Sequence, residues 1–119
     1  MTQPLALALS LLLELPVVVG LCLALGWVER RSIPRLLVVG AAATLLTHPF
    51  AWHGFTALKP WVGPYWLRAL LLEGGVAVVE GLLYAALVPV GRGRGQILGW
   101  AANAWSYGFG LGLLALGLV

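Results

Sequence analysis

Four long stretches of apolar residues, separated by three short polar connectors, make up nearly the whole chain. The apolar stretches cover residues 5–27, 36–55, 66–90 and 97–119. Each approaches or exceeds the roughly 20 apolar residues that a helix needs to cross a hydrocarbon core of about 30 Å. The pattern predicts an all-α integral membrane protein, a four-transmembrane-helix bundle that forms a single domain over residues 1–119.

The connectors carry most of the positive charge, and they carry it unevenly. The first and third connectors lie on the same side of a four-span bundle and hold five arginines, whereas the other side has only two basic residues: Arg30, Arg31, Arg35, Arg92 and Arg94 against Lys59 and Arg68. The positive-inside rule places the arginine-rich side in the cytoplasm. We therefore expect both termini on the outer side of a plasma (inner) membrane of bacterial type.

Composition changes this picture little but excludes other classes. With 61% hydrophobic and 9% charged residues, the chain has too little polar surface to cover a soluble globule. The net charge of +3 comes from residues near helix ends, without a basic face for nucleic acid, so lipid headgroups are the expected neighbours. The first stretch lacks a basic n-region and a clear cleavage site, and we expect a retained helix instead of a signal peptide.

Ionisable residues inside the apolar stretches are the main clue to function. Three of the four acidic residues, Glu14, Glu73 and Glu80, lie there together with His48. Such groups are costly in a bilayer and usually face a bundle interior or a pathway. Because seven residues make nearly two helical turns, Glu73 and Glu80 project from almost the same face. We expect these four side chains to form a polar intramembrane site.

Other polar residues extend this predicted site. Tyr84 continues the line of Glu73 and Glu80, and Asn103 is the hydrogen-bonding residue on a narrow face of small residues in the fourth stretch. We expect Asn103 and Tyr84 to shape a pathway, although intramembrane Asn and Tyr side chains also serve simply to join helices. Pro16 and Pro49, beside Glu14 and His48, are expected to bend their helices.

Three functions remain open. The favoured one is a small transporter or channel that moves a cation or proton, in which protons and cations compete for the same carboxylates. A second is an intramembrane enzyme acting on a membrane substrate, either activating water with Glu and His or using a divalent metal held by Glu14, His48, Glu73 and Glu80. No known hydrolytic motif accompanies these residues. The third is a non-catalytic subunit of a larger membrane complex.

The length, the four spans and the glutamate in the middle of the first span resemble the small multidrug resistance transporters. That resemblance implies a dimer in which Glu14 exchanges protons for cationic drugs. It is architectural, because Glu73, Glu80 and the His48-Pro49 pair are not part of that family's pattern. Gly95-x-x-x-Gly99 and Gly108-x-x-x-Gly112 favour a homo-oligomer or a membrane partner subunit, with close packing inside one chain as the alternative.

Overall fold

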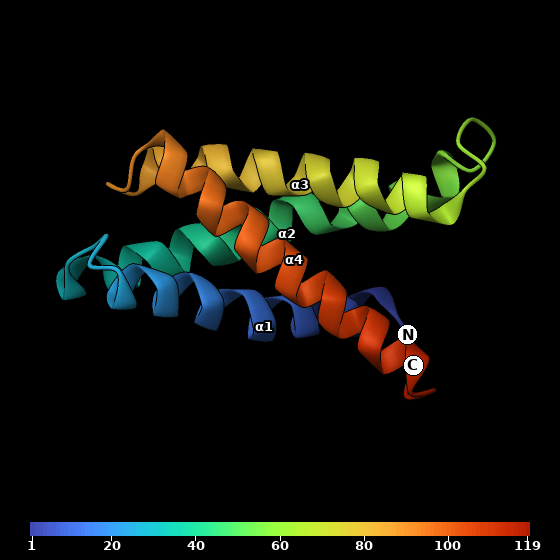
Figure 1. Cartoon of the computed structure of the whole chain (residues 1–119), viewed down its shortest axis with the longest axis horizontal. Helices are drawn as coiled ribbons and strands as arrows, with labels where there is room; N and C mark the ends of the chain where they lie inside the picture. Colours follow the sequence, from blue (N-terminus) through green and yellow to red (C-terminus); the bar gives the residue numbers. More distant parts are fainter.

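The computed structural model describes all 119 residues and contains four long α-helices joined by short connectors (Figure 1). The helices are α1 (Gln3–Ala24), α2 (Ile33–Ala57), α3 (Tyr65–Leu87) and α4 (Arg92–Ala115), and a 3₁₀ turn, η1 (Arg30–Ser32), precedes α2. The prediction of an all-helical bundle with four helices is confirmed. α1, the helical stretch Arg30–Ala57 and α3 are long and apolar enough to cross a membrane. α4 is as long, but its glycines and polar side chains make it less apolar.

Proline and glycine explain most of the helix ends. Pro4 and Pro34 stand in the first turns of α1 and α2, where a missing N–H costs nothing. α1 ends in a tight turn at Gly26, which adopts a φ of 65° while the Trp27 N–H donates to the Cys22 carbonyl at 2.9 Å. Gly91, with a φ of 86°, is the N-cap residue directly before α4 and ends the short connector after α3. The short connectors force neighbouring helices to run antiparallel.

Each helix packs mainly on two others, so that the four surround a common interior. α1 contacts α2 and α4, and α3 contacts the same two helices. α4 crosses the bundle obliquely, from the end of α3, where the last connector joins the two helices, toward the beginning of α1 (Figure 1). The α2–α3 connector and both termini lie at one end of the bundle, and the arginine-rich connectors lie at the other (Figure 1).

The closest packing joins α3 and α4 through glycine. A Cβ atom added to Gly95 would lie 2.6 Å from the Gly81 carbonyl oxygen, and one added to Gly99 would lie 2.7 Å from the Gly81 nitrogen. The Gly95-x-x-x-Gly99 motif is thus used inside the chain, as the alternative interpretation expected. Gly108 and Gly112 have open space beside them, and oligomerisation stays a prediction.

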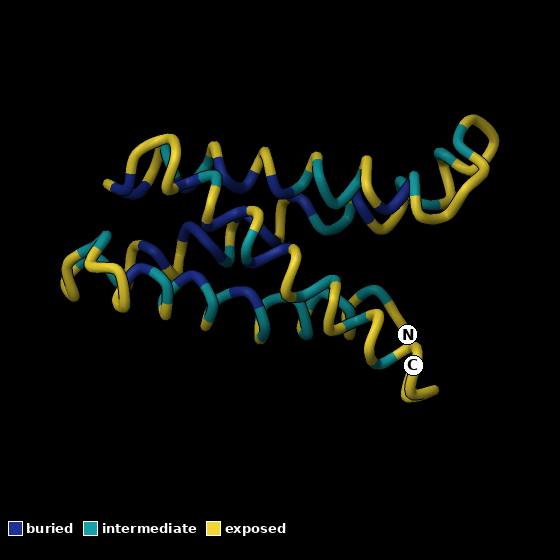
Figure 2. Tube along the Cα trace, in the orientation of Figure 1, coloured by how far each residue is buried: buried dark blue, intermediate teal, exposed yellow.

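The outer surface of the bundle is far more apolar than that of a soluble protein. Only 23 of the 119 residues are buried, and buried positions follow one side of each helix (Figure 2). Buried polar residues include Glu14, Glu80 and Asn103, whereas many large apolar residues face outward, among them Leu12 (71% exposed) and Phe50 (74% exposed). Large apolar side chains on the outside, with ionisable groups turned inward, are what a lipid environment favours.

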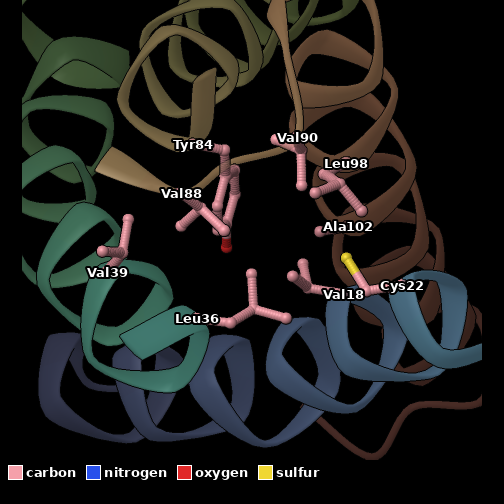
Figure 3. Packing of buried hydrophobic residues seen from close by; sticks show 9 residues of the cluster. All are labelled: Val18, Cys22, Leu36, Val39, Tyr84, Val88, Val90, Leu98 and Ala102. Atoms are coloured by element: carbon pink, nitrogen blue, oxygen red, sulfur yellow. The ribbon is translucent and has the colours of Figure 1, made fainter. Parts of the chain in front are cut away.

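A hydrophobic cluster fills the half of the bundle nearer the arginine-rich connectors. Tyr84 of α3 points into its middle, surrounded by residues of α1, α2, α4 and the connector that follows α3 (Figure 3). Its buried members are Val18, Cys22, Leu36, Val39, Tyr84, Val88, Val90, Leu98 and Ala102. This half of the molecule therefore has an apolar interior, and the polar interior lies toward the chain termini.

Candidate functional site

Glu80 on α3 is held by two neutral side chains from different helices. Thr47 Oγ1 of α2 lies 2.7 Å from Glu80 Oε1, and Asn103 Nδ2 of α4 donates to Glu80 Oε2 at 2.7 Å. Glu80 is 1% exposed, so these side chains take the place of water around its carboxyl group. The contacts join three helices at one acidic residue.

Glu14 on α1 is held in the same way by the same two partner helices. Thr44 Oγ1 of α2 donates to Glu14 Oε2 at 2.8 Å, and Ser106 Oγ of α4 lies 2.8 Å from Glu14 Oε1. Glu14 is 4% exposed. Each carboxyl group is thus bound on both oxygens, once from α2 and once from α4.

The four partners form two pairs, each with a spacing of three residues. Thr44 and Thr47 lie on adjacent turns of α2, and Asn103 and Ser106 do the same on α4, so that one face of each helix reaches both glutamates. The main-chain oxygen of Asn103 lies 3.3 Å from Ser106 Oγ and links the two sets of contacts. Sequence reasoning identified Asn103 but did not include Thr44, Thr47 or Ser106 in the site. The matched three-residue spacings were the available signal.

The two glutamates line a cavity of about 510 Å³ that reaches the end of the bundle where the termini lie. Its wall comes from α1 and α3 as far as Glu14 and Glu80, and from α2 and α4 starting at Thr44 and Asn103, and it extends to Met1 and Val119. Aromatic side chains supply much of the wall away from the acids: Trp52, Phe55, Tyr65, Tyr107 and Phe109. The volume is in the range of pockets that accept small molecules.

Glu73 and His48 line the same cavity but are bound less completely. Glu73 is only partly buried and makes no side-chain hydrogen bond. His48 stacks on Trp52 with ring centroids 6.1 Å apart, and its Nε2 atom is buried without a hydrogen-bond partner. Both groups are therefore free to bind a molecule that enters the cavity, whereas Glu14 and Glu80 already have partners.

Tyr84 lies away from this cavity. Its side chain is 1% exposed and belongs to the hydrophobic cluster, although it is only one turn from Glu80. The residue that was expected to shape a pathway instead packs the apolar half of the bundle. α1 and α2 continue without interruption through Pro16 and Pro49.

The geometry gives little support to the metal alternative. No group of three or more His, Cys, Asp or Glu side chains is close enough to hold a metal ion. The carboxyl oxygens of Glu14 and Glu80 are hydrogen-bonded to hydroxyl and amide groups, and the His48 ring stacks on Trp52. The four proposed ligands share a cavity without forming a coordination site.

No basic side chain neutralises the interior acids. The one ion pair in the structure joins Arg31 to Glu29, both exposed in the first connector. Arg68, the basic residue nearest in sequence to Glu73, donates to the carbonyl oxygens of Val62 and Gly63 at 2.9 and 2.7 Å. The three interior glutamates therefore face one another across a cavity that contains no arginine or lysine.

These features define a class of protein: a helical bundle with an apolar exterior and an acidic interior cavity that extends toward one end. Comparison with protein-family models, curated proteins and solved structures gave no match for this chain. The geometry of the site is thus the basis for any functional assignment.

Proposed function

We propose that the chain is a small membrane transporter that exchanges a cation for protons at Glu14 and Glu80. In this proposal all four helices cross a plasma membrane of bacterial type. The arginine-rich connectors face the cytoplasm in accordance with the positive-inside rule, and both termini face outward. Three helices with sufficient length and apolarity, together with the apolar exterior, support this placement.

One observation carries the proposal: two acidic residues from separate helices line the same cavity, and neither forms an ion pair. Burying a carboxylate is costly unless an opposite charge or a proton compensates for it. A cation that enters the cavity supplies such a charge, and protons supply the compensation when the cation has left. The competition between them couples the two movements.

The hydrophobic cluster favours a transporter over an open channel. The cavity begins at the chain termini and ends near Glu14 and Glu80, beyond which Tyr84 and its neighbours fill the interior. A channel needs a continuous polar path, and this arrangement offers access from one end only. Exchange then requires a second conformation, in which the residues of the hydrophobic cluster separate and the cavity closes at the end near the termini.

Specific contacts make the other two functions less suitable. Both amide protons of Asn103 are engaged, with Glu80 and with the Gly99 carbonyl oxygen, so that none is left for an oxyanion. Neither Glu14 nor Glu80 contacts His48, as a water-activating pair would require. A subunit whose acids await a partner would expose them, but Glu14 and Glu80 are enclosed by the chain's own helices.

Flux through liposomes tests the proposal. Purified protein reconstituted in liposomes with an acidic interior should release protons when sodium, potassium, magnesium or tetraethylammonium is added outside, as reported by a pH-sensitive dye. Glu14→Gln and Glu80→Gln should each abolish the cation-dependent release, because an amide cannot exchange a proton. Both variants should keep the helical circular dichroism spectrum of the parent.

Glu29→Gln is the matched control, since it makes the same chemical change at an exposed connector residue. Its flux should equal that of the parent protein. Cation-dependent proton release that persists unchanged in both Glu14→Gln and Glu80→Gln would overturn the proposal, and so would the absence of release with every cation supplied.

A further inference from the structure

Two hydroxyl groups in the site each lie within hydrogen-bonding distance of two acceptors. Thr47 Oγ1 is 2.7 Å from Glu80 Oε1 and 2.9 Å from the main-chain oxygen of Ala43. Ser106 Oγ is 2.8 Å from Glu14 Oε1 and 3.3 Å from the main-chain oxygen of Asn103. A hydroxyl group has one proton to donate, and a main-chain oxygen has none. The two contacts of one hydroxyl group are both full hydrogen bonds at the same time only when the carboxyl group supplies the second proton.

The remaining carboxyl oxygens fit the same assignment. Glu80 Oε2 accepts from Asn103 Nδ2, and Glu14 Oε2 accepts from Thr44 Oγ1. A neutral carboxylic acid has one O–H donor and one carbonyl acceptor. The contacts of both glutamates thus fit a neutral acid, in which Oε1 donates to the hydroxyl oxygen and Oε2 accepts, as well as an ionised one.

The same hydroxyl groups also suit the ionised acids. When Glu80 loses its proton, the Thr47 hydroxyl turns its hydrogen from the Ala43 oxygen to Glu80 Oε1. The Ala43 oxygen keeps its main-chain helical hydrogen bond, so that no group is left without a partner. Ser106 does the same between Asn103 and Glu14. Neither change requires a helix to move.

We propose that Thr47 and Ser106 are positioning residues that let Glu80 and Glu14 bind and release one proton each, giving two exchangeable protons per chain. The inference rests on the proposed function and deepens it by naming the two hydroxyl groups that hold each acid in both protonation states and the number of protons that one chain exchanges. In each release the acid O–H bond breaks, the proton passes to water in the cavity, and the carboxylate left behind attracts the incoming cation.

Other titratable groups face the same interior from each helix packed around the two acids. They are the Met1 amino group, His48 on α2, Glu73 and Tyr84 on α3, and Tyr107 on α4. None of them makes a hydrogen bond to Glu14 or Glu80. Substituting Glu14 or Glu80 therefore distinguishes the titration of the two acids from that of these groups.

Infrared spectroscopy of the purified protein in detergent, without a transported cation, tests the inference directly. Bands of two hydrogen-bonded protonated carboxyl groups should be present at neutral pH and should disappear on alkalinisation. Glu14→Gln should remove one band, Glu80→Gln the other, and the double variant both. Glu73→Gln should leave the two bands in place.

The positioning role is tested by removing a hydroxyl group while keeping its shape. Thr47→Val should shift the Glu80 band and lower cation-dependent flux about tenfold, as expected for the loss of one hydrogen bond to a group that becomes charged. Thr47→Ser should restore both. Thr56→Val is the matched control, because Thr56 lines the cavity on the same helix without touching an acid. If Thr47→Val does not fold, Ser106→Ala applies the same test at Glu14, where the residue is only half-buried.

Two results would overturn the inference: no protonated carboxyl band at neutral pH, or bands at Glu80 and Glu14 that Thr47→Val and Ser106→Ala leave unshifted. These outcomes are distinguishable from failure of the proposed function. A protein with both bands and the expected shifts but no flux would contradict transport while retaining the two proton sites.

Discussion

At the scale of single residues, the interior acids differ in how firmly the fold holds them. Glu80 and Glu14 are each bound on both oxygens, whereas Glu73 lines the cavity without a hydrogen bond. Residues that are bound on every side contribute to stability as well as to chemistry. A residue without partners contributes to chemistry alone, and mutations can separate the two.

Asn103→Ala tests the stabilising contacts of Glu80. The substitution removes the donor to Glu80 Oε2 and leaves a buried oxygen unsatisfied, so the free energy of unfolding should fall by about 1–3 kcal/mol. Reversible unfolding in a detergent mixture, followed by circular dichroism, measures this. Gln96→Ala is the control, because the one side-chain hydrogen bond of Gln96, to the Val78 oxygen, is made from a less buried position. A loss no larger than the control's would contradict the expected role of Asn103.

Glu73→Gln should behave in the opposite way. Because the Glu73 carboxyl has no hydrogen-bond partner, the free energy of unfolding should stay within about 0.5 kcal/mol of the parent value. Cation affinity should fall, since a negative charge is lost from the cavity wall. Calorimetric titration with a cation that drives proton release in the liposome assay, and thermal unfolding of the same sample, give both quantities. Marked destabilisation would show that Glu73 has a structural role.

The sequence predicts the acids better than their partners. A glutamate in an apolar helix is conspicuous because placing an ionisable group in a membrane costs free energy. Asn103 is conspicuous as the one amide side chain in the centre of its helix. Threonine and serine are common in membrane helices, where they often bond only to their own backbone. The matched three-residue spacings were the one sequence signal for Thr44, Thr47 and Ser106, and the carboxyl groups that they bind are identified only when the helices are placed around them.

At the scale of helices, glycine controls how close α3 and α4 approach. Gly99→Ala should lower the free energy of unfolding by about 1–3 kcal/mol, because the added methyl group meets the backbone of Gly81. Gly108→Ala is the matched control on the same helix, where a Cβ meets nothing within 4 Å. It should be neutral or stabilising by up to about 1 kcal/mol. Equal effects of the two substitutions would contradict this account of the packing.

The helices themselves were predictable, whereas their packing was only partly so. Apolar length and connector composition predict four helices, yet α4 begins at Arg92, five residues before its apolar stretch, because charged residues form its first turn. The face shared by Glu73, Glu80 and Tyr84 suggested one continuous polar stripe. In the structure Glu73 and Glu80 line the cavity, whereas Tyr84 lies in the hydrophobic cluster, because the neighbouring helices change along α3. The periodicity of a single helix contains no information about how other helices cross it.

At the scale of the whole molecule, the proposed orientation predicts which ends can be reached from outside. Single cysteines should be introduced at Lys59 and Arg31 in a Cys22→Ala background, since Cys22 is the only native thiol. In intact cells an impermeant maleimide should label Lys59→Cys and not Arg31→Cys, whereas both should react after lysis. Labelling of Arg31→Cys alone in intact cells would contradict the proposed orientation and support the opposite one.

The hydrophobic cluster around Tyr84 also determines where an electric field would act. A membrane potential falls mainly across dry, low-dielectric material and very little across a hydrated passage open to the bath. In the proposed orientation Glu14 and Glu80 would therefore lie electrically close to the external solution, although they are deep in the bundle. A proton reaching them from outside would cross little of the voltage, whereas its onward passage to the cytoplasm would gain nearly all of the roughly 2.3 kcal/mol available per 100 mV.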